Sequence, residues 1–164
     1  MQDESSCYGM IMDHFFRERC FSEVIMEDSP ARVHFDADLP LKKEGKWIDL
    51  GFSRYEYLQA VCQFMTDLMK EYFGVDVALG DFHTPEACTT EKLSYHILLP
   101  YNFKDLAARQ NFKKCVENAK SLLKVDDSIY YQVMKINSAL DSSIYSISRV
   151  FRLHGCCKEG KKNH

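Results

Sequence analysis

The chain has 164 residues, which is the length of one domain. Its composition, 46% hydrophobic, 27% charged and 13% aromatic residues, excludes a disordered chain. The net charge of −3 favours no particular partner, no apolar run is long enough to span a membrane, and the N-terminus lacks the features of a signal peptide. The seven cysteines, an odd number without an export signal, indicate free thiols in a reducing compartment, so we expect an intracellular protein.

The first half of the chain predicts a short helix, two strands and one long helix. Residues 14–25 are typical of a short helix that runs into a strand. Residues 31–38 are rich in β-forming side chains and bounded by prolines, which predicts a strand, and 40–52 read as a polar loop. Ser53 and Glu56 have the spacing of a capping box, apolar residues follow at helical spacing, and Gly74 suits a helix end. We therefore expect a helix over 54–73.

The second half adds four strands and another long helix. We expect a short strand at 75–79, a polar loop at 80–91 and a strand at 92–99 that Pro100 stops. A helix over about 103–123 with Asn102 as its cap, a strand at 129–136 and a last strand at 144–154 follow. The order is β-α-β-β-α-β to within one element, and it predicts an α+β fold with helices on one face of a mainly antiparallel sheet.

Polar side chains with a period of two mark two of these strands. Asp36 and Asp38 would project from the same face, where two carboxylates repel each other unless cations sit between them. Lys92, Ser94 and His96 would likewise share one face and could bind phosphate. Each pattern alone has a plain alternative, namely acids at a strand end that face water and a structural histidine.

A third set lies near the C-terminus, where the charge balance turns basic. Asp141 precedes the last expected strand, Arg152 lies on it, and Lys158 follows Gly155. Three acids could hold two Mg²⁺ or Mn²⁺ ions, and the cations could bind a triphosphate. A nucleotidyl-transfer site would explain the three sets together.

The same residues carry a resemblance to a known family. The segments 35–38, 93–96 and 140–141 resemble the three motifs of the archaeo-eukaryotic primase superfamily, most of all those of eukaryotic primase-polymerases and of the primase-helicases of large DNA viruses. The likeness extends over residues 22–38, 54–73, 90–96 and 141–158, which together span most of the chain.

The resemblance implies a fold, an activity and roles for named residues. It implies an RRM-like catalytic module over 31–158, beside an N-terminal module at 1–30 and a basic tail at 159–164. The metal ligands and catalytic residues would be Asp36, Asp38 and Asp141. The contacts to the nucleotide would be Lys92, Ser94, His96, Arg152 and Lys158, with Arg149 and Tyr95 as possible template contacts. The expected reaction is attack by a primer 3′-hydroxyl on a nucleoside triphosphate, with two Mn²⁺ or Mg²⁺ ions.

The resemblance also implies partners and a cellular setting. We expect a single-stranded DNA template and a primer, and a role in replication restart, damage tolerance or viral priming. A single-strand-binding protein or a helicase would bind through parts outside this chain, and no membrane is involved. The expected location is the nucleus or mitochondrion for a cellular protein and the infected host cell for a viral one.

The sequence departs from the family pattern at several points. Asp38 stands where members often have Glu, and Tyr95 stands where they often have Arg. The cysteines show no C-x-x-C spacing, so we expect no zinc, and neither the family's zinc module nor a helicase part is seen. We therefore expect an isolated catalytic core of something longer.

Two other functions remain open on the residues alone. A non-catalytic RRM-like nucleic-acid-binding module would bind without divalent ions, and would carry exposed aromatic side chains on its sheet. A metal-dependent nuclease could use the same three acids, but it would need no cluster of cations for a triphosphate.

Overall fold

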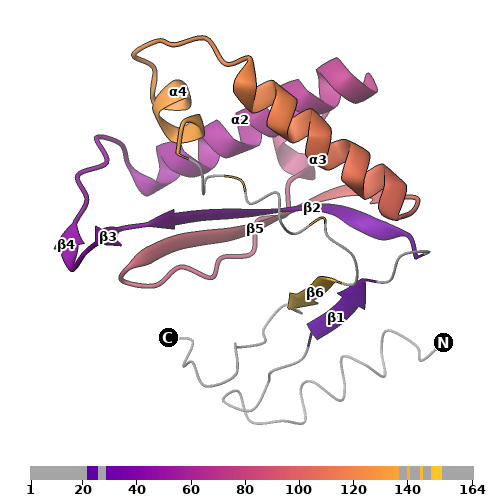
Figure 1. The fold of residues 1–164 in the computed structure, drawn as a ribbon, viewed down its shortest axis with the longest axis horizontal. Helices are drawn as coiled ribbons and strands as arrows, with labels where there is room; N and C mark the ends of the chain where they lie inside the picture. The colour runs from indigo at the N-terminus through magenta and orange to yellow at the C-terminus, as the bar shows by residue number, and fades with distance from the viewer. Residues whose placement is uncertain (1–21, 26–28, 137–139, 141–144, 146–148, 153–164) are drawn as a thin grey trace.

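The chain has an α+β fold, seen in a computed structural model that describes residues 22–25, 29–136, 140, 145 and 149–152 (Figure 1). For residues 22–25 and 149–152 it describes the backbone alone. The described strands are β1 (Ser22–Ile25), β2 (Ala31–Pro40), β3 (Lys42–Lys43), β4 (Lys46–Trp47), β5 (Lys92–Phe103) and β6 (Arg149–Arg152). The helices are α2 (Arg54–Phe73), α3 (Leu106–Ser121) and α4 (Ile129–Met134), with a 3₁₀ turn, η2 (Leu79–Asp81).

The strands pair antiparallel in three two-stranded ladders, which are β2 with β5, β1 with β6, and β3 with β4. The loop before β5 runs along the other edge of that strand, where isolated bridges join His83 to Leu98, Glu86 to Tyr95 and Thr89 to Lys92. The β2–β5 pair is therefore flanked by further chain along the β5 edge.

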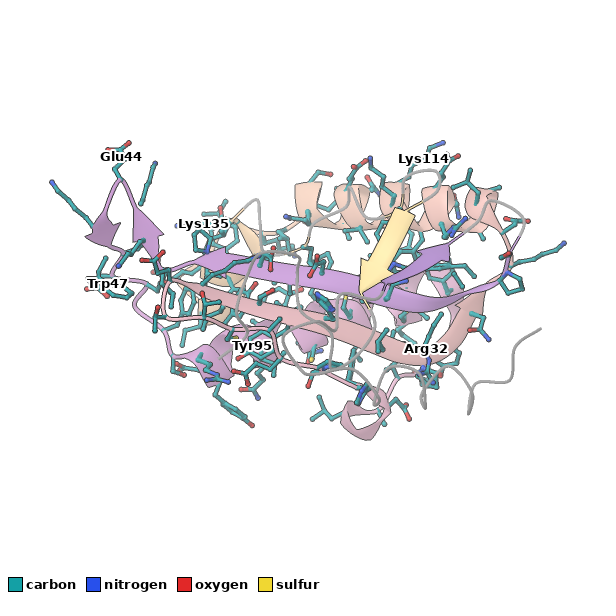
Figure 2. The ribbon with its side chains drawn as sticks, turned by 90° about the horizontal axis from the view of Figure 1, so that it is seen from below. Arg32, Glu44, Trp47, Tyr95, Lys114 and Lys135 are labelled. Atoms are coloured by element: carbon teal, nitrogen blue, oxygen red, sulfur yellow. The ribbon has the colours of Figure 1, made fainter. Side chains whose placement is uncertain are left out.

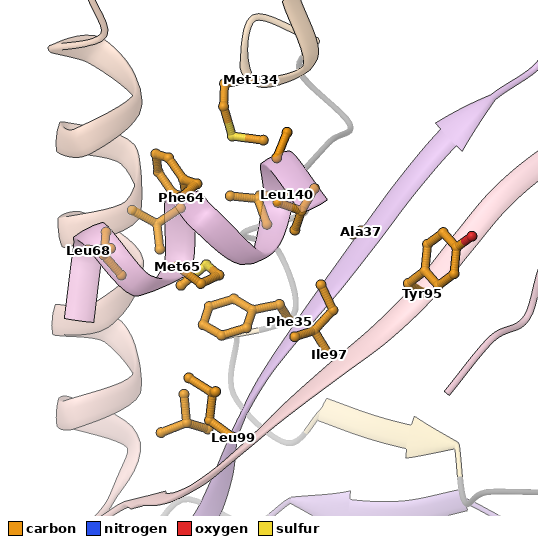
Figure 3. Close-up of a cluster of buried hydrophobic side chains, with 14 of the residues drawn as sticks. Phe35, Ala37, Phe64, Met65, Leu68, Tyr95, Ile97, Leu99, Met134 and Leu140 are labelled. Atoms are coloured by element: carbon orange, nitrogen blue, oxygen red, sulfur yellow. The ribbon is translucent and has the colours of Figure 1, made fainter. Parts of the chain in front are cut away.

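The helices cover one face of the β2–β5 pair, as the sequence predicts, and the β1–β6 pair lies on the other side (Figures 1 and 2). Side chains alternate along both strands, so that every second one enters the core beneath the helices. Figure 3 shows this core, in which residues of the two strands meet α2, α4 and the segment before β6: Phe35, Ala37, Ile97, Leu99, Phe64, Met65, Leu68, Met134 and Leu140.

Helix α2 begins and ends at the predicted residues. Ser53 Oγ accepts a hydrogen bond from Glu56 N at 3.2 Å, and Glu56 Oε2 accepts one from Ser53 N at 2.7 Å, which completes the capping box. At the other end Gly74 adopts φ +67° and donates to the carbonyl of Lys70 at 3.1 Å. The prediction of this helix from local signals is confirmed.

The other helices differ from the predictions. Helix α3 starts later than expected, because Asp105 rather than Asn102 caps it by accepting from Ala108 N at 2.9 Å. The prediction of a strand at 129–136 is wrong, because residues 129–134 form a helix. Ser128 accepts a hydrogen bond from Tyr131 N at 3.1 Å and starts α4, which packs against α2 through the buried Val133 and Met134. Packing against a neighbouring helix here overrides the β propensity of Ile, Tyr and Val.

The predictions of the two central strands, β2 and β5, are right in place and wrong in their bounds. β2 runs on to Pro40, and β5 continues through Pro100 to Phe103. Between the pairs Arg32–Asn102 and His34–Leu98, β2 advances two residues while β5 advances four, so the proline lies in a bulge.

Four further segments agree with the predictions to different degrees. The expected strand at 75–79 is irregular chain, and the expected loop at 40–52 contains the β3–β4 hairpin. The last expected strand is seen as β6, and the helix expected at the start of 14–25 lies outside the described residues. No described helix is both long and apolar enough to cross a membrane.

Candidate functional site

Five of the predicted site residues lie together on the face of β2 and β5 that points away from the helices. The antiparallel register sets Asp36 opposite His96 and Asp38 opposite Ser94, with Lys92 two residues before Ser94 on the same face. The residues between them, such as Ala37 and Ile97, are fully buried in the core. The structure thus brings two acids onto one surface with three side chains that could donate hydrogen bonds to a phosphate. We call this surface the acid–donor face.

Asp38 is held through both of its carboxylate oxygens. Ser94 Oγ donates a hydrogen bond of 2.6 Å to Oδ1, and the ammonium of Lys92 forms an ion pair with Oδ2. The side chain of Lys92 is 43% exposed and that of Asp38 is 25% exposed, so solvent reaches this pair. A pair this exposed contributes at most about 1 kcal/mol to stability, and its partners can separate at little cost.

Asp36 faces the imidazole of the opposite strand. Its Oδ1 lies 3.5 Å from Nε2 of His96, a contact that becomes an ion pair when the imidazole is protonated. Both side chains are mostly shielded, with 18% of His96 and 25% of Asp36 exposed. The acid–donor face therefore contains its own counter-charges, which reduces the repulsion between the two carboxylates.

The two acids also affect the core beneath them. Burial raises the pKa of the Tyr57 phenol on α2, and the negative charges of Asp38 and Asp36 raise it further. Tyr57 is fully buried, so its ring stays neutral and supports the strands from the helix side. Sequence patterns showed Tyr57 only as part of α2, since its relation to the acids depends on how the helix packs.

Tyr95 lies on the opposite face from the acids. Its side chain is only 3% exposed, and its hydroxyl accepts a hydrogen bond of 2.8 Å from Arg54 Nε, while the guanidinium of Arg54 also pairs with Glu86. Burial raises the pKa of Tyr95 to about 12. Tyr95 thus joins the start of α2 to the loop before β5, and the structure does not bring it to the acid–donor face. Sequence analysis did not single out Arg54 or Glu86.

Of the remaining predicted site residues, the structure describes only a part. Asp141 and Lys158 lie outside the described residues. Arg149 and Arg152 lie on β6, paired with Ile25 and Ser22 of β1, and only their backbone is described. The convergence of three acids thus stays a prediction.

Asp36 and Asp38 fit hard divalent ions, because both are partly exposed carboxylates on one face. Within the described part of the chain, no group of three or more His, Cys, Asp or Glu side chains is arranged to hold a metal. The two acids thus form an incomplete set for which Asp141 is the predicted third member. The described cysteines at 62, 88 and 115 are free thiols.

No protein-family model matches the chain, and neither does any curated protein.

Proposed function

We propose that the chain is the catalytic core of a DNA-directed primase-polymerase, a nucleotidyltransferase that joins a nucleoside triphosphate to a primer 3′-hydroxyl on a single-stranded DNA template. The observation that carries the proposal is the β2–β5 register, which sets Asp36 and Asp38 directly across from His96 and Ser94. The two acids alone could be strand-end residues. Two acids beside a row of side chains that can donate hydrogen bonds to phosphate form a site for a phosphate group bound together with divalent cations.

Each residue of such a site would have its own role. Asp36 and Asp38 would hold divalent ions, with Asp141 from the sequence motif as the third ligand. Two Mn²⁺ or Mg²⁺ ions, when bound, would activate the primer hydroxyl and stabilise the leaving pyrophosphate. Lys92 would release Asp38 and neutralise the triphosphate, while Ser94 and His96 would orient it by donating hydrogen bonds. Arg152 and Lys158 would complete the phosphate contacts.

The finer architecture and the setting belong to the same proposal. The helices on one face of the β2–β5 pair are compatible with an RRM-like module whose helix-free face carries the site. The partners would be template, primer and nucleoside triphosphates, in replication restart, damage tolerance or viral priming. The resemblance described above supports this choice, and the polar face supplies the chemistry that it requires.

A primer-extension assay tests the proposal. We expect the wild-type chain to extend a labelled primer in Mn²⁺ or Mg²⁺, and Asp36→Asn with Asp38→Asn to abolish extension while the circular dichroism spectrum stays unchanged. The matched control is Asp67→Asn, which removes one exposed carboxylate from α2 and should extend as the wild type does.

The same assay separates the alternatives. Shortening of the labelled primer would indicate a nuclease. Nucleic-acid binding without any incorporation, and without a need for divalent ions in nucleotide binding, would indicate a non-catalytic module. Either result, or full extension by the double variant, would refute the proposal.

A further inference from the structure

The β3–β4 hairpin projects from one end of the molecule, beyond the end of β2 that carries Asp38 (Figures 1 and 2). Its strands are two residues long, and the turn between them contains Glu44 at φ +51° and Gly45 at φ +78°. A two-stranded hairpin of this size adds little stability of its own. What the hairpin contributes therefore lies in the side chains that it presents.

The hairpin presents the chain's single tryptophan to solvent. Trp47 is 64% exposed, and the ammonium of Lys42, its cross-strand partner, lies 4.4 Å from the centre of its ring. Lys42 also forms an ion pair with Glu91 at 2.8 Å, just before β5 begins. The cation fixes the ring from one side and leaves most of the aromatic surface open.

The other cross-strand pair of the hairpin is Lys43 with Lys46. Like charges directly opposite each other destabilise a hairpin, and within the described residues neither lysine forms an ion pair. Exposed lysines on a short strand can serve to prevent edge-to-edge aggregation, but an exposed tryptophan next to Lys46 works against that purpose. A bound anion would relieve the repulsion between the two ammonium groups.

The register thus gives the hairpin an exposed aromatic ring on one face and two lysines, Lys43 and Lys46, on the other. An exposed ring together with nearby ammonium groups is the combination that binds an unpaired nucleic-acid strand. Bases stack on the ring without regard to sequence, and the ammonium groups contact the phosphates. A duplex offers no unpaired base for such stacking. The four residue steps from Asp38 to Lys42 span at most about 13 Å of extended chain, so a nucleic-acid strand bound here would also reach the acid–donor face.

We propose that the β3–β4 hairpin is a binding surface for single-stranded nucleic acid, with Trp47 as the stacking platform and Lys43 and Lys46 as phosphate contacts. The choice of a template strand as the natural ligand rests on the proposed function. The chemistry of recognition rests on the hairpin alone. Glu44 at the tip opposes the phosphates and limits the affinity.

Because the chain has one tryptophan, its intrinsic fluorescence reports on this surface directly. We expect an oligo(dT) of about 12 nucleotides to quench Trp47 fluorescence with saturation, and a hairpin duplex of the same length to quench it far less. Lys43→Ala with Lys46→Ala should weaken binding roughly tenfold. It should also reduce the slope of log K against log salt by about 1.4, the value for two lost phosphate contacts on a single strand.

Matched variants distinguish binding by the hairpin from non-specific attraction of DNA to any lysine on the surface. Lys114→Ala with Lys124→Ala removes two exposed lysines elsewhere, and Figure 2 shows Lys114 at the opposite end of the molecule. This control should bind as the wild type does. Anisotropy of a labelled oligo(dT) should show roughly ten- to hundredfold weaker binding for Trp47→Ala and an intermediate loss for Trp47→Phe, which keeps an aromatic ring. Glu44→Gln should bind a few-fold more tightly, since it removes a negative charge from the tip.

Three results would overturn the inference. The first is oligo(dT) binding by anisotropy without any change in Trp47 fluorescence. The second is equal weakening in the hairpin double variant and the Lys114/Lys124 control. The third is stronger quenching by anionic phosphatidylserine vesicles than by oligo(dT), which would indicate a membrane surface instead.

The outcome is distinguishable from failure of the proposed function. Asp36→Asn with Asp38→Asn should leave oligo(dT) quenching intact although extension is lost. If the hairpin variants bind oligo(dT) normally while extension still depends on the acids, the inference fails and the proposed function stands. If oligo(dT) quenches Trp47 fluorescence but the chain never incorporates nucleotide, the inference stands and the proposed function fails.

Discussion

Replacement of Phe112 by alanine should produce the largest loss of stability among single changes on α3. Phe112 is 1% exposed and is the central ring of an aromatic cluster. Its ring centre lies 5.2 Å from Phe35 on β2, 5.1 Å from Phe103 on β5, 5.5 Å from Phe73 on α2 and 5.6 Å from Tyr145. The residue thus joins two helices to both strands of the central pair.

The expected magnitude follows from this burial. Truncation of a buried phenylalanine removes its transfer free energy and leaves a cavity, which together cost about 3–5 kcal/mol. For a chain of this length each 1 kcal/mol lowers Tm by about 2–4 °C, so we expect a fall of roughly 6–20 °C. The free energy of unfolding from urea titration and Tm from circular dichroism both measure it.

The control for this change is Tyr55→Ala, which truncates an aromatic ring that is 73% exposed in the first turns of α2. It should alter the free energy of unfolding by no more than about 0.5 kcal/mol. A loss below about 1 kcal/mol for Phe112→Ala, or equal losses for the two variants, would refute the placement of α3 against the strands.

Three further changes test other parts of the fold. Gly74→Ala should lower the free energy of unfolding by about 1 kcal/mol because φ is +67°, although nothing lies within 4 Å of the added methyl; an unchanged urea midpoint would contradict the left-handed helix end. Burial lowers the pKa of His34 below its value of 6.5 in the unfolded chain, so the unfolded state binds the proton more readily. Stability should therefore fall as pH drops below about 6.5, and His34→Gln should flatten that pH dependence in urea titrations at pH 5 to 7. Burial raises the pKa of Cys62 to about 11, so iodoacetamide at pH 8 should label Cys62 in urea but hardly at all in the folded chain; rapid labelling without urea would show that α2 is not packed as described.

The sequence predicted best those elements whose signals are local. The capping box of Ser53 and Glu56 and the glycine at 74 define α2 by hydrogen bonds within a few residues, and no distant contact is needed. The alternation along β2 and β5 likewise placed Asp36 and Asp38 on one face, because strand geometry fixes the period.

The elements that depend on distant contacts were predicted less well. Ile129–Met134 has the composition of a strand, yet the cap at Ser128 and the surface of α2 make it a helix. The pairing of Asp38 with Lys92 and Ser94 could not be read from either strand, since it depends on the register between segments more than fifty residues apart. Arg54 was missed for the same reason, because its partner Tyr95 comes from another element.

The bulge near Pro100 has a consequence for the length of the strands. β5 carries two more residues than β2 across this point, and an even insertion leaves the parity of the side chains unchanged. Leu99 and Phe103 therefore both stay in the core on either side of the proline. Deletion of Pro100 alone would move the side chains at one end of β5 to the opposite face of the strand. Deletion of Pro100 and Tyr101 together would keep every remaining side chain on its present face. Strand length at this end of the molecule can thus change in steps of two, and the acids at the other end would not be disturbed.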